Sequence, residues 1–235
     1  MENLPALMYA APILGTVLTV GIYCRATKSP KTAIVIIAAW LVLQACLSLN
    51  DFYLVTDVMP PRFALTLLPP VALIIALLST RAGKQYTDGL DMKWLTLLHV
   101  VRLPVEIMLL ALYYHKGIPE LMTFEGRNFD ILSGISAPVV YYFGFVRKTL
   151  GKRTLLAWNI ICLGLLIHIV ADAILAAPFP FQQFAFDQPN IAVLYFPFVF
   201  LPCCIVPLVL WSHLAAIRQL IMQPSFHPRH SLDLK

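Results

Sequence analysis

Long apolar runs joined by short polar connections fill almost the whole chain. A bilayer core requires about 20 predominantly apolar residues in each crossing helix. By that measure seven spans are predicted, at residues 6–24, 32–50, 63–80, 94–114, 130–147, 155–177 and 191–215. The fifth is the weakest, because "ILSGISAPVVYYFGFV" is short and contains two glycines and a proline. The expected fold class is therefore all-α, a polytopic seven-transmembrane-helix bundle in residues 1–222, with a short tail over 223–235.

Composition supports a membrane protein and excludes an ordinary soluble one. Of the 235 residues, 60% are hydrophobic and 12% are charged, and the mean hydropathy is +0.79. Soluble domains are about 45–50% apolar and about 25% charged. The lipid bilayer is thus the expected partner, and no separate soluble domain fits beside the spans. The five cysteines all lie within apolar runs, so a disulfide framework is not expected.

Basic residues alternate between the two ends of the predicted spans. Thirteen of them fall in the first, third and fifth connections and in the tail, namely Arg25, Lys28, Lys31, Arg81, Lys84, Lys93, Arg147, Lys148, Lys152, Arg153, Arg218, Arg229 and Lys235. The other connections hold three, Arg62, Lys116 and Arg127. Because Lys and Arg are retained on the cytoplasmic side, the N-terminus is predicted outside and the C-terminus inside. The same asymmetry accounts for the net charge of +5, so no nucleic-acid partner is expected.

Three polar residues interrupt the fourth apolar run, in the stretch "HVVRLPVE". At 100° per residue, Arg102 lies about 60° from His99, and Glu106 lies about 20° from it, so all three share one helix face. An ionised group at the bilayer centre costs about 3 to more than 10 kcal/mol, and such groups face the bundle interior or a wet cavity. We therefore expect this face to point inward, with Arg102 and Glu106 paired one helical turn apart.

A second polar pair lies in the sixth run, where His168 and Asp172 are one turn apart. More polar side chains gather near the predicted outer ends of the spans, and those chosen as candidate ligand-binding residues are Asn50, Asp51, Tyr113, Arg127 and Asp130. Together with the face of "HVVRLPVE", they predict a polar cavity that opens outward between the second, fourth, fifth and sixth spans.

The leading functional hypothesis is binding, with or without transport, of a small anionic or amphiphilic ligand in that cavity. Arg102 would hold an anionic group, because a guanidinium binds a carboxylate or phosphate through two parallel hydrogen bonds. Glu106, His99, His168 and Asp172 would be polar or proton-handling groups. A structural subunit, whose buried charges only hold helices together, remains an alternative.

An intramembrane metal-dependent hydrolase is a further alternative, with His168, Asp172 and Glu106 as ligands. In helix count and in its His-x-x-x-Asp pair, the chain distantly resembles the seven-helix hydrolases that include alkaline ceramidases and adiponectin receptors. It lacks the His-x-x-x-His of their last helix, since His213 stands alone there. Two-histidine haem ligation by His99 and His168 is not expected, because their depths differ by roughly 11 Å. Retinal is excluded, since no predicted span contains a lysine for a Schiff base.

Three stretches, "LHVVRLPVE", "ELMTFEGRNFDI" and "PFQQFAFDQPNIAVLYFPFVF", carry a resemblance to an uncharacterised family of bacterial seven-helix integral membrane proteins. The resemblance extends over most of the chain. It implies a bacterial cytoplasmic membrane as the location, and it implies no activity, cofactor or catalytic residue.

Overall fold

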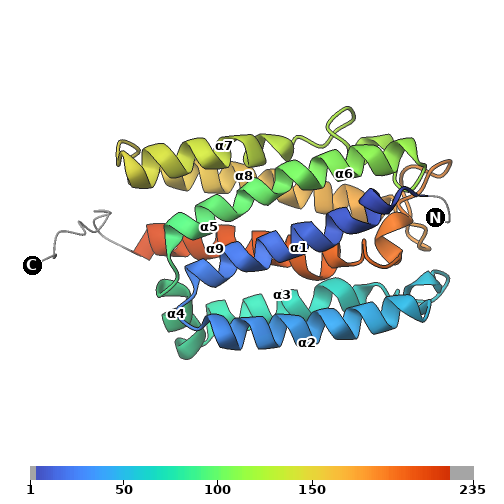
Figure 1. Ribbon diagram of the computed structural model, residues 1–235, viewed down its shortest axis with the longest axis horizontal. Coiled ribbons are helices and arrows are strands. Elements are labelled where there is room, and N and C mark those ends of the chain that lie inside the picture. The colour runs from blue at the N-terminus through green and yellow to red at the C-terminus, as the bar shows by residue number, and fades with distance from the viewer. Residues whose placement is uncertain (1–3, 223–235) are drawn as a thin grey trace, which may run out of the picture.

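A computed structural model describes residues 4–222, and it is a bundle of helices that run back and forth along one axis (Figure 1). The long helices are α1 (Ala6–Ala26), α2 (Pro30–Leu49), α3 (Ala64–Ser79), α7 (Ile131–Tyr141), α8 (Lys152–Leu175) and α9 (Val206–Met222). Between α3 and α7 the chain forms α4 (Arg81–Asp88), α5 (Met92–Leu98) and α6 (Arg102–Tyr114). The predicted tail over 223–235, with Arg229 and Lys235, lies outside the described residues.

Five helical segments are long and apolar enough to cross a membrane, namely Ala6–Ala26, Pro30–Leu49, Met92–Tyr114, Lys152–Leu175 and Leu201–Met222. The pair α3 and α4 meets the same test as one unit, although it is bent by 92°. The helix Ile131–Val146, formed by α7 and the π-helix η4 (Tyr142–Val146), is apolar but shorter. The all-α fold class is confirmed, with five helices in residues 4–222, or six if the bent pair is one span, that are long and apolar enough to cross a membrane.

The last predicted span begins at residue 191, but the apolar helix that the structure has there extends from Leu201 to Met222. The first part of the predicted span forms a 3₁₀ turn, η5 (Ala192–Leu194), and an irregular segment, while the helix begins with the π-helix η6 (Leu201–Ile205) and continues in α9 to Met222. Pro197 explains the shift, because proline lacks an N–H and disfavours helical backbone in the residue before it. The segment is apolar because Val193, Phe198 and their neighbours are buried as a plug at one end of the bundle.

A proline inside the last helix is compensated by a neighbouring helix. Pro207 has no N–H to donate to the carbonyl of Cys203, four residues earlier. Instead, Trp40 of α2 donates its indole Nε1–H to that carbonyl at 2.9 Å. This bond attaches α2 to the start of the last helix, as expected where a freed carbonyl lies away from water.

The exposed sides of the helices are apolar, as a lipid-facing surface requires. Leu7, Val17 and Val35 expose 76%, 65% and 67% of their surface. On α2 only Ala33, Gln44 and Ser48 are buried, so this helix lies at the periphery of the bundle. In Figure 1, α2 and α3 lie together on one side, with α1, α5 and α9 between them and the layer of α6, α7 and α8.

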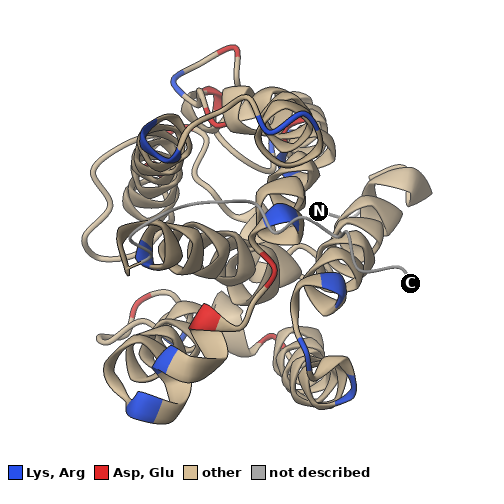
Figure 2. Ribbon diagram, turned by 90° about the vertical axis from the view of Figure 1, so that its left-hand side faces the viewer, with Lys and Arg blue, Asp and Glu red and all other residues tan. Residues whose placement is uncertain are grey.

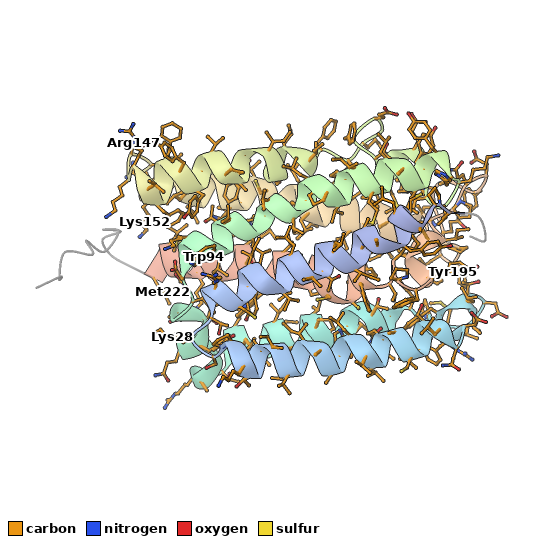
Figure 3. The ribbon with its side chains drawn as sticks, in the orientation of Figure 1. Lys28, Trp94, Arg147, Lys152, Tyr195 and Met222 are labelled. Carbon is orange, nitrogen blue, oxygen red and sulfur yellow. The ribbon has the colours of Figure 1, made fainter. Side chains whose placement is uncertain are left out.

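Basic residues gather at the end of the bundle that carries α4. Figure 2 looks on to this end, where Lys and Arg positions recur on several helices. Figure 3 labels Lys28, Arg147 and Lys152 there, together with Trp94, while Tyr195 lies at the opposite end. The described chain therefore has the charge asymmetry that the sequence pattern indicates.

Candidate functional site

The fourth predicted span turns its polar face inward, as expected. His99, Arg102 and Glu106 expose 0%, 3% and 2% of their surface. The span consists of α5, the 3₁₀ turn η2 (His99–Val101) and α6. Pro104 is in the first turn of α6, and its missing N–H leaves the carbonyl of Val100 without its usual helical donor, which fits the tighter winding just before it.

The guanidinium of Arg102 is at the centre of a buried polar network. Its Nη1 donates to Oδ1 of Asp130 at 2.7 Å and, more weakly, to the carbonyl of Cys162 at 3.4 Å. Its Nη2 lies 3.0 Å from Nε2 of His213. The network thus joins α6 to the start of α7, to α8 and to α9.

The partners of His213 fix its protonation state. Arginine can only donate, so Nε2 of His213 must accept from Arg102. Nδ1 lies 2.9 Å from Oδ1 of Asn159, while the amide nitrogen of Asn159 donates to the carbonyl of Leu155. Nδ1 is therefore the protonated nitrogen, and His213 is a neutral imidazole held between an arginine and an amide.

His99 lies flat against His213. The two ring centroids are 3.8 Å apart and the planes differ by 13°, and Trp158 packs edge-on against His99. Neither ring nitrogen of His99 has a hydrogen-bond partner among residues 4–222. The stacked rings form one side of the network, and His99 leaves two buried polar atoms without a partner.

Glu106 belongs to a separate set of contacts. Nδ2 of Asn128 lies 2.7 and 2.8 Å from the two carboxyl oxygens of Glu106 and also donates to the carbonyl of Met122 at 3.0 Å. Oδ1 of Asn128 accepts from the backbone N–H of Asp130. Within the described residues no cationic side chain lies within 4.0 Å of the Glu106 carboxyl, so its charge has no ion-pair partner.

Two cavities border the segment 119–130, which carries Asn128 and Asp130. The inner one has a volume of about 90 Å³, has Glu106, Asp130 and Asn190 as its polar lining residues, and is otherwise lined by apolar side chains, most of them from α3, α6, α8 and η6. A water molecule needs about 10–15 Å³ of such space, so several fit. The outer one, of about 450 Å³, is lined by Tyr113, Glu120, Arg127, Asp187 and Gln188 among others.

Several predicted contacts differ from those found. Arg102 and Glu106 are not paired with each other, because Asp130 lies closer to the guanidinium than the carboxyl one turn away. Asp172 is buried and lies 3.6 Å from Arg127, and Nδ1 of His168 lies 4.0 Å from its carboxyl, as the one-turn spacing predicts, but the side chain of His168 is half exposed on the outside of the bundle. Asn50 and Asp51 are exposed at the end of α2, which does not line the inner cavity.

The proposed metal ligands are not brought together. Across residues 4–222 no group of three or more His, Cys, Asp or Glu side chains is arranged to hold a metal ion. Asp172 pairs with Arg127, Glu106 binds Asn128, and His168 is exposed, so the ligand set expected for a hydrolase is not assembled.

Three residues of the site, His213, Asn128 and Asn159, escaped sequence reasoning. His213 is 111 positions from Arg102 and 54 from Asn159, so helical periodicity carries no information about these contacts. Asn128 lies in a connection, where an amide is expected to be solvated. A usable signal was the isolated His213 in an apolar run, since a buried histidine requires partners.

Comparison with known proteins places the chain in a family. The profile of a family described as a domain of unknown function (DUF8737) matches residues 58–221. This is more than half of the chain, so the chain belongs to that family, and the expected membership of an uncharacterised family is confirmed. The match contains the Arg102 network and Glu106, while α1 and α2 precede it. No curated protein and no solved structure matches the chain.

Proposed function

Starting from that family membership, we propose that the chain is an integral protein of a bacterial cytoplasmic membrane that binds a small amphiphilic ligand. In this proposal it spans the bilayer seven times, with the N-terminus outside and the C-terminus inside. Ile131–Val146 is the remaining span, with 16 residues that reach about 24 Å at 1.5 Å per residue. This is shorter than a hydrocarbon core of about 30 Å, and local thinning of the bilayer accommodates the difference.

The observation that carries the proposal is the state of Glu106. Its carboxyl is buried, borders the inner cavity and lacks an ion-pair partner in the described chain. Arg102 is neutralised by Asp130, so it leaves no net positive charge for Glu106. Because an uncompensated charge in a membrane interior costs several kcal/mol, Glu106 requires either a proton or a cationic group of a ligand.

The polar atoms that face the inner cavity favour a ligand with hydrogen-bond donors. Glu106 and Asp130 present carboxyl oxygens, and Oδ1 of Asn190 is buried without a partner in the described residues. A ligand with an ammonium or hydroxyl group matches these acceptors, and an apolar tail matches the rest of the lining. The anionic ligand in the initial hypothesis has less support, because Arg102 already binds Asp130 and His213.

Access to this site is proposed from the outer cavity. Segment 119–130 contributes Glu120 and Arg127 to the outer cavity and Met122 and Asp130 to the inner one. Movement of this segment would connect the two spaces. Transport is the extension of the proposal, in which a proton taken up by Glu106 exchanges with the ligand.

Three probes with the same eight-carbon tail test the proposed ligand class, namely octylamine, octanol and octanoate. Thermal unfolding of the full chain in nanodiscs is followed with each probe. A probe at 100 times its Kd stabilises the folded state by about 2.7 kcal/mol. We expect octylamine and octanol to raise the unfolding temperature, and octanoate not to do so. Glu106→Gln should abolish the octylamine effect, while Glu125→Gln, at an exposed carboxyl that lines neither cavity, serves as the matched control.

The outcomes separate the hypotheses. Stabilisation by octanoate alone would contradict a ligand with hydrogen-bond donors and would favour an anionic ligand instead. Equal responses of wild type and Glu106→Gln to octylamine would remove Glu106 from the site. If none of the three probes has an effect, the buried charges serve only to hold the helices together, as in the structural alternative.

A further inference from the structure

A third cavity lies on the other side of the last helix, away from Glu106. Its volume is about 400 Å³, within the range of about 300–1,000 Å³ that is typical of small-molecule sites. The lining comes from α1, α2, α3, α4, η6 and α9 and is almost entirely apolar. Prolines and small residues create the space, among them Pro69, Pro70 and Pro207, Ala33 on α2 and the thiols of Cys203 and Cys204.

One end of this cavity is polar. Tyr23 and Tyr86 line it, their hydroxyls are 2.8 Å apart, and the hydroxyl of Thr27 lies 3.0 Å from that of Tyr86. Trp211 also lines the cavity and is 97% buried, since it exposes only 3% of its surface. Its indole Nε1–H lies near the hydroxyl of Tyr23 but makes no hydrogen bond of normal geometry within the described chain. A buried donor with an incomplete hydrogen bond is unfavourable, so an oxygen atom in the cavity would complete it.

Basic residues lie at the same end of the bundle, where Asp88 of α4 is already paired with Arg218. The short helix α4, which reaches the cavity through Tyr86, turns by 92° away from α3 and carries Arg81 and Lys84. The ammonium group of Lys28 lies against Gly89, directly after α4. Figure 3 shows Lys28 at this end of the bundle, beside α4. The cavity thus combines apolar walls with a buried indole donor, and Lys28 lies at the same end of the bundle, which are features that match the chain, ester oxygens and phosphate of a lipid.

We propose that this cavity binds one acyl chain of an anionic phospholipid. The acyl chain occupies the space between the α2–α3 pair and α9, an oxygen below the headgroup accepts from Trp211, and the phosphate lies beside Lys28. This site is independent of the ligand proposed at Glu106. The charge selects the occupant, because each Lys or Arg near an anionic headgroup contributes about 1 kcal/mol, or about fivefold in affinity.

Native mass spectrometry of the full chain, with phosphatidylglycerol or phosphatidylcholine of identical chains added, tests the proposal. We expect one phosphatidylglycerol to remain bound and phosphatidylcholine to bind more weakly. Ala33→Trp fills the cavity and should abolish the bound lipid. Ala38→Trp, on the exposed face of the same helix, should leave it unchanged. Lys28→Gln should weaken the binding of phosphatidylglycerol about fivefold. Arg147→Gln, at the same end of the bundle but outside the cavity lining, should leave that binding unchanged.

A second measurement does not depend on the folding of a filled-cavity variant. Phosphatidylglycerol brominated in its chains should quench the tryptophan fluorescence of the wild type more than equally brominated phosphatidylcholine, because Trp40 and Trp211 line the cavity. Trp211→Phe should remove most of the difference. Equal quenching by the two lipids, the same bound lipid in both alanine variants, or equal effects of Lys28→Gln and Arg147→Gln would overturn the proposal.

Discussion

Removal of either member of the Arg102–Asp130 pair should destabilise the fold far more than removal of both. The Nη1–Oδ1 distance is 2.7 Å, and the two side chains are only 4% and 6% exposed. Loss of one partner leaves an unpaired charge in the bundle interior, and breaking such a buried pair costs about 3–5 kcal/mol. We expect Asp130→Asn and Arg102→Met each to lower the free energy of unfolding by about 3–5 kcal/mol.

The double variant Arg102→Met/Asp130→Asn removes both charges. Replacement of a complete buried pair by uncharged groups is often close to neutral. His213 also loses its donor in this variant, at about 1 kcal/mol for a typical hydrogen bond. The double variant should therefore lose much less free energy of unfolding than the two single variants added together. The difference is a coupling energy of at least about 2 kcal/mol.

A double-mutant cycle with unfolding by denaturant in mixed micelles measures this coupling. The control is the cycle for Arg218 and Asp88, which form two bonds of 2.9 Å at the exposed end of the bundle. Their coupling should be only about 0.2–1 kcal/mol, because solvent screens it. Equal coupling energies for the two pairs would refute the view that Arg102 and Asp130 form a buried, mutually neutralising pair.

Three further substitutions have distinct expected effects on thermal unfolding. Gly126→Ala should destabilise by about 1–3 kcal/mol, because its Cβ would overlap the backbone of Glu120 and Leu121; a wild-type unfolding temperature would contradict this close approach. His213→Leu leaves Nη2 of Arg102 and Oδ1 of Asn159 without partners and should cost about 2–5 kcal/mol, more than His213→Gln. Arg127→Gln should change stability by less than about 1 kcal/mol, since its guanidinium is half exposed and lies 3.6 Å from Asp172.

Periodicity and charge pattern predict the bundle well because each depends on neighbouring residues. The inward face of His99, Arg102 and Glu106 follows from 3.6-residue spacing and from the cost of charge in hydrocarbon, and burial confirms it. The segment 191–200 has the sequence pattern of a membrane span because a buried plug and a membrane span are equally apolar. There, Pro197 was the better guide.

Partner choice within the site was beyond sequence reasoning, because it depends on how distant helices pack. Arg102 has Glu106 four residues away and Asp130 28 residues away, and it binds the distant one. Gly134 of α7 explains part of this choice. A Cβ there would lie only 3.0 Å from the backbone nitrogen of Leu103, so the glycine allows α7 to bring Asp130 close to α6. His168 was placed inside on spacing alone, and nothing in its spacing separates an inward from an outward face.

The most direct test of the central claim is the reaction of Glu106 with an apolar carbodiimide, which modifies protonated carboxyl groups that water does not reach. The account predicts that peptide mapping of the full chain finds the adduct at Glu106, and that Asp130, which is ion-paired with Arg102, stays unmodified. An unmodified Glu106, or equal modification of Asp130, would contradict a buried carboxyl that requires a proton or a cationic ligand.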